Sequence, residues 1–127
     1  MYELDIENFT KYVENLIETI GNTTLSNPDS EEVFPIFVVS NPMQTIKKVE
    51  NNIPVYTRFS ITIENWNNSR YESMNLHQKV YKLLREYNFC LVGSPIDMYD
   101  EITKKHRYGS RYEVNYNGLT NSFERII

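Results

Sequence analysis

Strict alternation of residue types between positions 55 and 64 constrains the fold of this chain more than any other feature. Every second residue there is apolar or β-branched and falls on one face of an extended segment: Val55, Thr57, Phe59, Ile61 and Ile63. A period of two is the pattern of a strand with one buried face. We therefore predict a strand from Ile53 to Glu64 that needs a covering layer on its apolar face.

An amphipathic helix from Ser69 to Tyr87 follows this strand and supplies a covering layer. Ser69 and Glu72 have the spacing of a capping box, in which the serine oxygen accepts the amide three residues later. The stripe predicted to face the sheet consists of Leu76, Val80, Leu83, Leu84 and Tyr87. A second helix is predicted from Ile6 to Ile20, because apolar residues recur at three- and four-residue spacing and Gly21 follows directly.

Shorter patterns predict further strands. Apolar residues from Val33 to Val39 indicate a buried strand, with Pro35 favouring an edge position or a bulge near its start. The run from Phe89 to Val92 indicates a short buried strand that Gly93-Ser94-Pro95 would stop. The segment from 41 to 52 fits either a connecting arm or an irregular strand, and the sequence does not define its role.

The last elements complete the predicted fold class. Alternation from Arg111 to Asn117 predicts a one-sided strand, and Asn117-Gly118 favours a tight hairpin turn into a short pairing element. The order helix, strands, helix, strands is typical of an α+β fold. We predict a small antiparallel or mixed sheet with helices packed on one face, and a single domain over residues 1–127.

Charge and composition exclude several function classes. The formal net charge of −4 gives no positive field to attract nucleic-acid phosphates, which argues against duplex binding as the main role. Cys90, the single cysteine, cannot form an internal disulfide, and the acidic start lacks the features of a secretory signal. No apolar run approaches the ~20 residues of a membrane span. We expect a soluble protein made in a reducing cytosol.

Candidate chemical groups form no recognisable catalytic constellation. Asp97, Asp100, Glu101 and His106 have the ligand types of a hard-metal or hydrolytic site, but their spacing matches no metal motif, which favours a solvated acidic loop. His77 and Cys90 are expected to be structural core residues, because neither has a partner at catalytic or metal-ligand spacing. We predict no catalytic residue, no metal and no cofactor.

Two polar segments have the composition of interaction surfaces. The basic run from Lys104 to Arg107, with Arg111 and Tyr108 nearby, suits an acidic protein partner or a solvated face better than a nucleic-acid backbone in this acidic chain. The second segment is the polar face of the predicted strand, which fits solvent exposure and a subunit interface equally well. Its residues are Tyr56, Arg58, Ser60, Thr62 and Glu64.

Taken together, the layout over roughly residues 33 to 117 resembles the tail terminator and tail-completion proteins of long-tailed bacteriophages. The resemblance is one of element order and residue type, without a diagnostic short motif. It is carried by Phe34-Pro35, the Tyr56–Glu64 strand running into Trp66-Asn67, the helix residues Leu76, Val80 and Leu83-Leu84, the following Tyr87-Asn88-Phe89, and the late strand Arg111–Tyr116. The segment from Gln44 to Asn52 has no clear counterpart in the family layout.

The resemblance implies a virion assembly protein without enzymatic activity. Such a subunit forms a hexameric ring at the head-proximal end of the tail tube, stops tube polymerisation and meets a head-completion protein. DNA passes only through the lumen, no membrane is involved, and six copies carry 6 × −4 = −24 charges. Residues expected at subunit or tube contacts are Arg58, Glu64, Trp66, Arg107 and Arg111.

Two alternatives stay open at this stage. The first is another neck protein, such as a head-closure subunit, which would bind portal-adaptor protein in place of tail-tube protein. The second is a small cytosolic enzyme or regulator that uses the loop from Asp97 to His106. Alanine substitutions in that loop that abolish function without harming assembly would favour the second alternative.

Overall fold

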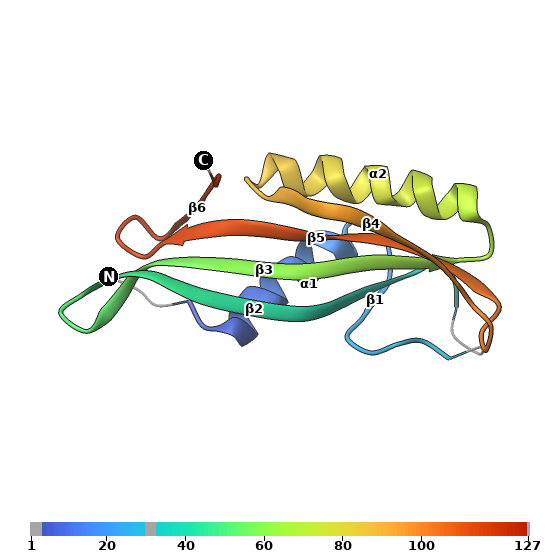
Figure 1. Cartoon of the computed structure of the whole chain (residues 1–127), viewed down its shortest axis with the longest axis horizontal. Helices are drawn as coiled ribbons and strands as arrows, with labels where there is room; N and C mark the ends of the chain where they lie inside the picture. Colours follow the sequence, from blue (N-terminus) through green and yellow to red (C-terminus); the bar gives the residue numbers. More distant parts are fainter. Residues whose placement is uncertain (1–3, 30–32, 127) are drawn as a thin grey trace.

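The computed structural model describes residues 4–29 and 33–126 and shows an α+β fold (Figure 1). Two helices pack on a six-strand, mostly antiparallel open sheet, which confirms the predicted fold class. The chain order is α1 (Ile6–Glu18), β1 (Thr23–Thr24), β2 (Ile36–Glu50), β3 (Ile53–Asn67), α2 (Arg70–Glu86), β4 (Cys90–Asp100), β5 (Lys105–Asn117) and β6 (Ser122–Glu124).

Two long hairpins form the sheet. Its strand order is β1-β2-β3-β5-β4, and β6 pairs with β5 beyond the start of β4. β3 and β5 pair along twelve positions, from Tyr56 opposite Asn117 to Asn67 opposite His106. Only the short β1 is parallel to its neighbour β2, so the sheet is mixed. β3 and β5 are therefore the central strands, and β2 and β4 flank them.

Side-chain capping starts both helices, and the cap at Ser69 is the one that the sequence predicted. The Asp5 carboxylate accepts the amide of Asn8 at 2.8 Å at the start of α1. The Ser69 hydroxyl accepts the amide of Glu72 at the start of α2, at a longer 3.4 Å. Each bond satisfies one of the amides that a helix N-terminus leaves without a partner.

The main core lies between the helices and one face of the sheet. Phe9 is central to it, stacking on Phe59 with ring centroids 4.4 Å apart. The cluster joins residues from α1, α2, the three strands β2, β3 and β5, and the connection between α2 and β4: Phe9, Val13, Ile17, Phe37, Val39, Phe59, Ile61, Ile63, Val80, Leu84, Phe89, Tyr112, Val114 and Tyr116. Since both helices contribute to one cluster, they cover the same face and leave the other without a helix.

The predicted ends of β3 and β4 and the predicted start of β5 were wrong, since β5 begins at Lys105 and not at Arg111, whereas the irregular-strand alternative for residues 41–50 is confirmed. Residues 41–50, which the sequence left as an arm or irregular strand, form the second half of β2 and pair with β3 down to a turn at Asn51-Asn52. β3 does not break after Glu64 but continues to Asn67. β4 continues through Gly93-Ser94-Pro95, because a shift in register between Val92 and Ile96 absorbs these residues as an irregularity in the strand.

The predicted buried stripe of α2 was only partly right. Val80 and Leu84 are buried, and Leu76 and Leu83 are partly buried against the core, but Tyr87 is largely exposed. The buried residues near the helix start are instead Ser73 and His77. Both are polar, so a search for apolar spacing does not detect them.

The C-terminal hairpin has a wider turn than predicted. Asn117 pairs with Ser122, so four residues separate the two strands. The Asn117 side-chain oxygen accepts the amides of Leu119 and Thr120 inside this turn. β6 confirms the predicted pairing element, although it covers only Ser122–Glu124.

Candidate interaction surface of the sheet

The sheet face that carries no helix is called the open face here. Alternation along β3 and β5 turns polar and charged side chains toward it, since residues opposite each other in an antiparallel pair share a face. From β3 these are Tyr56, Arg58, Ser60, Thr62, Glu64 and Trp66, and from β5 they are Arg107, Gly109, Arg111, Glu113, Asn115 and Asn117.

Glu64, Trp66 and Arg107 form a compact cluster on the open face. The guanidinium of Arg107 donates to both carboxylate oxygens of Glu64, at 2.9 and 3.1 Å. The same guanidinium lies 4.8 Å from the centre of the Trp66 ring, within cation–π distance. Glu64 is only 6% exposed and Trp66 only 2%, so this ion pair is largely screened from water.

Gly109 makes this arrangement sterically possible. It lies opposite Glu64, and a Cβ at this position would lie 2.2 Å from the Ile63 carbonyl oxygen and 2.5 Å from Glu64 Cα. Such a Cβ would also lie 2.9 Å from Glu64 Cγ. The missing side chain leaves the volume through which Glu64 extends toward Arg107.

A small apolar cluster closes this end of the open face. Ile36 and Val38 of β2 pack with Trp66, and Phe34 lies against them. The Lys105 ammonium lies 4.8 Å from the centre of the Phe34 ring. Lys105 and Arg107, two cations of β5, therefore each lie over an aromatic ring. Both belong to the basic run predicted from Lys104 to Arg107, and both lie on the open face because alternate residues of a strand share a face.

Cross-strand hydrogen bonds continue along the face. Arg111 donates to the hydroxyls of Thr62 and Ser60, at 2.9 and 2.6 Å. Further along, Arg58 donates to the side-chain oxygen of Asn115 at 3.2 Å. Three arginines thus lie in order on the open face, each held by a partner on the neighbouring strand.

All five residues that the sequence analysis proposed for contacts lie on this face. The structure brings Glu64, Trp66 and Arg107 together, and it places Arg111 and Arg58 in sequence beyond them. Because Glu64 and Trp66 are buried, they position Arg107, whereas the half-buried arginines keep some surface at the face. Their contact with another molecule stays a prediction.

The segment from Asp97 to His106, predicted to be an acidic loop, is a hairpin of β4 and β5, and structural contacts hold its carboxylates. The Asp97 carboxylate accepts from Arg70 of α2, and this hydrogen bond lowers the Asp97 pKa. The Asp100 carboxylate accepts from the hydroxyl and the amide of Thr103, which lowers the Asp100 pKa. In residues 4–29 and 33–126, no three histidine, cysteine or acidic side chains are grouped to hold a metal.

A buried polar cluster under α2 contains a serine–histidine contact that resembles part of a catalytic site. His77 Nε2 lies 2.8 Å from Ser110 Oγ, and burial lowers the His77 pKa. Asn65 completes the cluster by donating to the carbonyl oxygens of Ser73 and Tyr108. Ser110 is fully buried, so a substrate does not reach its hydroxyl, and the cluster joins α2 to the sheet.

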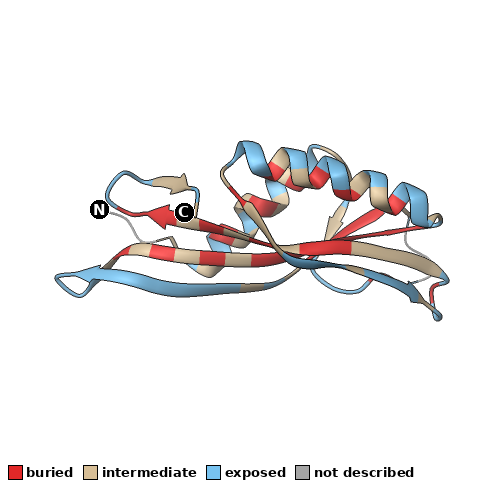
Figure 2. Ribbon diagram, turned by 45° about the horizontal axis from the view of Figure 1, so that its top comes forward, coloured by how far each residue is buried: buried red, intermediate tan, exposed pale blue. Residues whose placement is uncertain are grey.

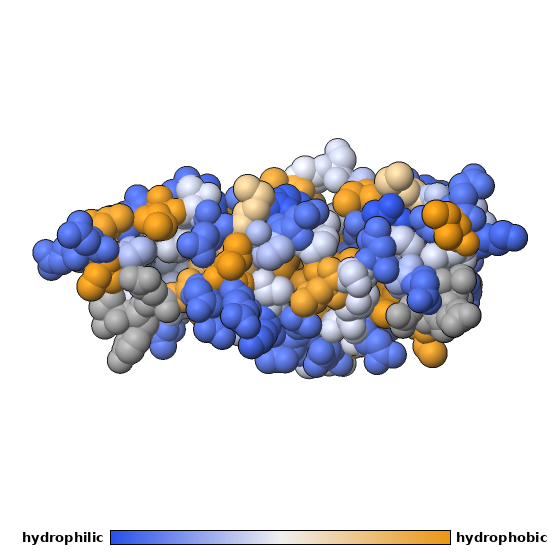
Figure 3. Space-filling model, turned by 90° about the horizontal axis from the view of Figure 1, so that it is seen from below, coloured by the Kyte–Doolittle hydropathy of each residue, from blue (hydrophilic) through white to orange (hydrophobic). Residues whose placement is uncertain are grey.

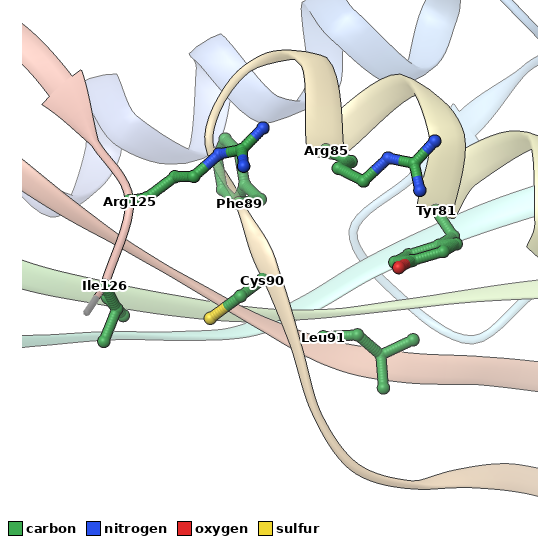
Figure 4. Close-up of a pocket in the computed structure, with 7 residues that line it drawn as sticks. All are labelled: Tyr81, Arg85, Phe89, Cys90, Leu91, Arg125 and Ile126. Atoms are coloured by element: carbon green, nitrogen blue, oxygen red, sulfur yellow. The ribbon is translucent and has the colours of Figure 1, made fainter.

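A cavity of about 480 Å³ lies between the end of α2, the start of β4 and the C-terminal segment (Figure 4). Arg85 and Arg125 approach it from different segments, and Arg85 lies over the Tyr81 ring. Cys90, predicted to be core, is only half-buried at this cavity. The complete lining is Tyr81, Arg85, Phe89, Cys90, Leu91, Arg125 and Ile126, which includes no histidine or carboxylate side chain to activate the thiol.

Both lateral edges of the sheet are exposed (Figure 2). The second half of β2 and most of β4 beyond Val92 are solvent-accessible. Figure 3 views the molecule from the side on which β2 lies and shows apolar side chains interspersed with polar ones. Large apolar side chains exposed along the two edges include Met43, Ile46 and Val49 on β2 and Met98 and Tyr99 on β4.

No protein-family model matches the chain, and no curated protein matches it in sequence. Neither α1 nor α2, the helices of the described residues, combines the length and apolar character that crossing a bilayer requires. A functional conclusion for this chain therefore rests on its own geometry, above all on the open face and the two sheet edges.

Proposed function

We propose that this protein is a virion assembly subunit of the tail terminator type. It forms a ring that seats on the head-proximal end of a phage tail tube, stops tube growth and offers its other side to a head-completion protein. The observation that carries the proposal is a sheet with one organised polar face and two edges that, among the described residues, are unpaired along the second half of β2 and along β4. Together these give a small subunit separate surfaces for its neighbours in a ring and for the tube.

The open face supports a role in binding another protein by its shape and its fixed polar groups. Its arginines are bonded to Glu64, to Thr62 and Ser60, and to Asn115, which fixes their positions on a rigid sheet. A polar surface of this kind suits contact with another folded protein, because interfaces of assembling subunits combine arginine and aromatic groups with hydrogen bonds. We assign this face to the tube.

Charge supports the passage of DNA through such a ring. Each chain has a net charge of −4, so a ring of six carries −24. Like charges disfavour adhesion of the phosphate backbone, and DNA would move through the lumen without being held. The protein would be made in the cytoplasm of the host bacterium and end in the virion at the head–tail junction.

Electron microscopy of the purified protein, alone and mixed with polymerising tail-tube protein from the same genome, tests the proposal. We expect tubes of limited length with a ring on one end. Free tubes of unrestricted length with bare ends would refute it. Binding to portal-adaptor protein without any effect on tubes would show the head-closure alternative to be correct.

A matched pair of variants connects this assay to the open face. Arg58→Ala and Arg111→Ala each remove one arginine from the face without opening the apolar core, so tube capping should weaken while the fold stays intact. Lys79→Ala, on the opposite side of the molecule in α2, serves as the control and should cap normally. Equal capping by all three variants would exclude the open face as the tube contact.

A further inference from the structure

The two outer strands of the sheet each have a defined stretch of unpaired backbone. Beyond Val38, the last residue beside β1, the outer edge of β2 has no partner strand among the described residues, and the outer edge of β4 likewise has none. Pro42 and Pro95 lack amide hydrogens and interrupt these edges. The stretches able to pair are therefore 43–49 on β2 and 96–100 at the end of β4.

The strand directions fit these two edges to each other. β2 is antiparallel to β3, β3 to β5, and β5 to β4, so β2 and β4 run in opposite directions within one subunit. A second copy in the same orientation, placed beside the first, brings its β2 alongside β4 in antiparallel fashion. Its helices then lie on the same side of the sheet, and the sheet continues from copy to copy.

The charges at the two edges are opposite. The stretch on β2 carries Lys47 and Lys48, whereas the stretch on β4 carries Asp97 and Asp100, with Glu101 directly after it. Pairing β4 with β4 of another copy would bring the carboxylates together, and pairing β2 with β2 would bring the lysines together. Cross-strand pairs of opposite charge stabilise a sheet and like pairs destabilise it, so the charges favour β2 against β4.

Apolar side chains define a register for this contact. Ile46 lies opposite Thr57 and Tyr99 opposite His106, which places both on the helix-covered side of the sheet, and each is 48% exposed. Placing Ile46 opposite Tyr99 in an antiparallel pair brings these two exposed apolar side chains together on one side of the sheet. Lys48 does not face Asp97 in this register, because the register shift after Ile46 places Lys48 opposite Tyr56 on the open face. The register is therefore defined by the apolar pair.

We propose that copies of this chain join head to tail, with residues 45–49 of β2 pairing antiparallel to residues 96–100 of β4 in the next copy. The inference rests on the proposed ring function and adds the two surfaces that build the ring. In a row of copies joined in this way, the first copy keeps an unpaired β2 edge or β4 edge, and the last copy keeps the other. Such a heterologous contact closes into a ring or extends without limit, unlike a symmetric dimer.

Disulfide trapping tests the contact even when association is weak. The variant carries Ile46→Cys and Tyr99→Cys in a Cys90→Ser background, and it is oxidised at high protein concentration. We expect a ladder of covalent oligomers on non-reducing gels that is lost on reduction. Each single-cysteine variant should give no ladder, because one cysteine per chain links at most two copies.

Two controls accompany this experiment, one for random cross-linking between colliding molecules and one for folding. Tyr71→Cys with Leu119→Cys places two exposed cysteines away from both edges and should give no ladder under the same oxidation. Circular dichroism establishes that each variant is folded. Monomers or dimers alone from the folded double variant would overturn the inference, and dimers would point to a symmetric contact.

Charge exchange provides a second test. Lys47→Glu with Lys48→Glu makes the β2 edge acidic, and Asp97→Lys with Glu101→Lys makes the β4 edge basic, with Arg70→Glu added to keep the Arg70–Asp97 ion pair in inverted form. We expect each variant alone to self-associate less than the original chain, and an equal mixture to recover association. The edge contact would be overturned if the mixture does not recover association and the double-cysteine variant gives no ladder.

These outcomes separate the contact from the proposed function. Tube capping that persists when both tests fail would leave the terminator role in place and exclude only the β2–β4 contact. Ladder formation together with a complete lack of tube capping would retain the contact and refute the terminator role.

Discussion

Replacement of Gly109 by alanine is expected to disrupt the centre of the sheet and the open face together. The added Cβ would lie 2.2 Å from a carbonyl oxygen of β3 and 2.5 Å from Glu64 Cα. Both are backbone atoms that cannot rotate away, so β3 and β5 must separate locally. Overpacking costs about 1–3 kcal/mol, and a contact with rigid backbone belongs at the upper end of that range.

The corresponding change in thermal stability is large enough to measure. An unfolding entropy near 2 cal/mol/K per residue converts about 3 kcal/mol into a fall of about 10 °C in Tm for a chain of 127 residues. The chain has a single tryptophan, Trp66, which lies beside the displaced Arg107. Its fluorescence should therefore change in the folded state of the variant, independently of Tm.

Gly93→Ala is the matched control for this substitution. Nothing lies within 4 Å of a Cβ at Gly93, but its φ of +73° strains any other residue by about 1–2 kcal/mol. Scanning calorimetry or circular dichroism should thus show a smaller loss of stability and unchanged Trp66 fluorescence. A Gly109→Ala protein that melts as high as the Gly93→Ala protein would refute the close approach of β3 and β5.

Further predictions concern the helix-covered core. Val80→Asp should destabilise the fold by about 3–5 kcal/mol in urea unfolding, because it buries an unpaired charge between α2 and the sheet; an unchanged midpoint would contradict the position of α2. Tyr112→Phe should stabilise the protein by up to about 1 kcal/mol, since the buried Tyr112 hydroxyl has no partner among the described residues; a lower Tm would contradict this. His77 has a lowered pKa, so the folded state binds its proton less readily than the unfolded state, and stability should fall as pH drops below about 6.5. In His77→Gln this part of the pH dependence of Tm should be absent, and a retained slope would assign it to other groups.

Long and strict patterns made the central elements predictable. The alternation of β3 and the capping residues of α2 are local signals, and each was sufficient to place its element. The edge strands gave weaker signals, because only one of their sides is paired and both faces include exposed polar residues. Gly93 and Pro95 led to the prediction of a turn where β4 continues with an irregularity, because turns and strand irregularities favour the same residue types.

The open face was predictable in part. Alternation placed Arg58 and Glu64 on one strand face, whereas Trp66 was expected beyond the end of that strand. Their partners depend on the register of β3 against β5, which joins Glu64 to Arg107, 43 positions later. The same alternation continues back to Lys105, where His106, Tyr108 and Gly109 obscured it. The burial of Ser73 and His77 depends on their bonds to β5, and helical periodicity contains no such information.

The bonds that hold Arg58, Arg107 and Arg111 on the open face also affect the entropy of docking. A long side chain that becomes immobile only on binding loses about 0.5–1.5 kcal/mol of rotational freedom. These three side chains have already lost much of that freedom when the subunit folds. A protein that docks on this face therefore meets a preorganised surface, and more of its contact energy remains available as affinity.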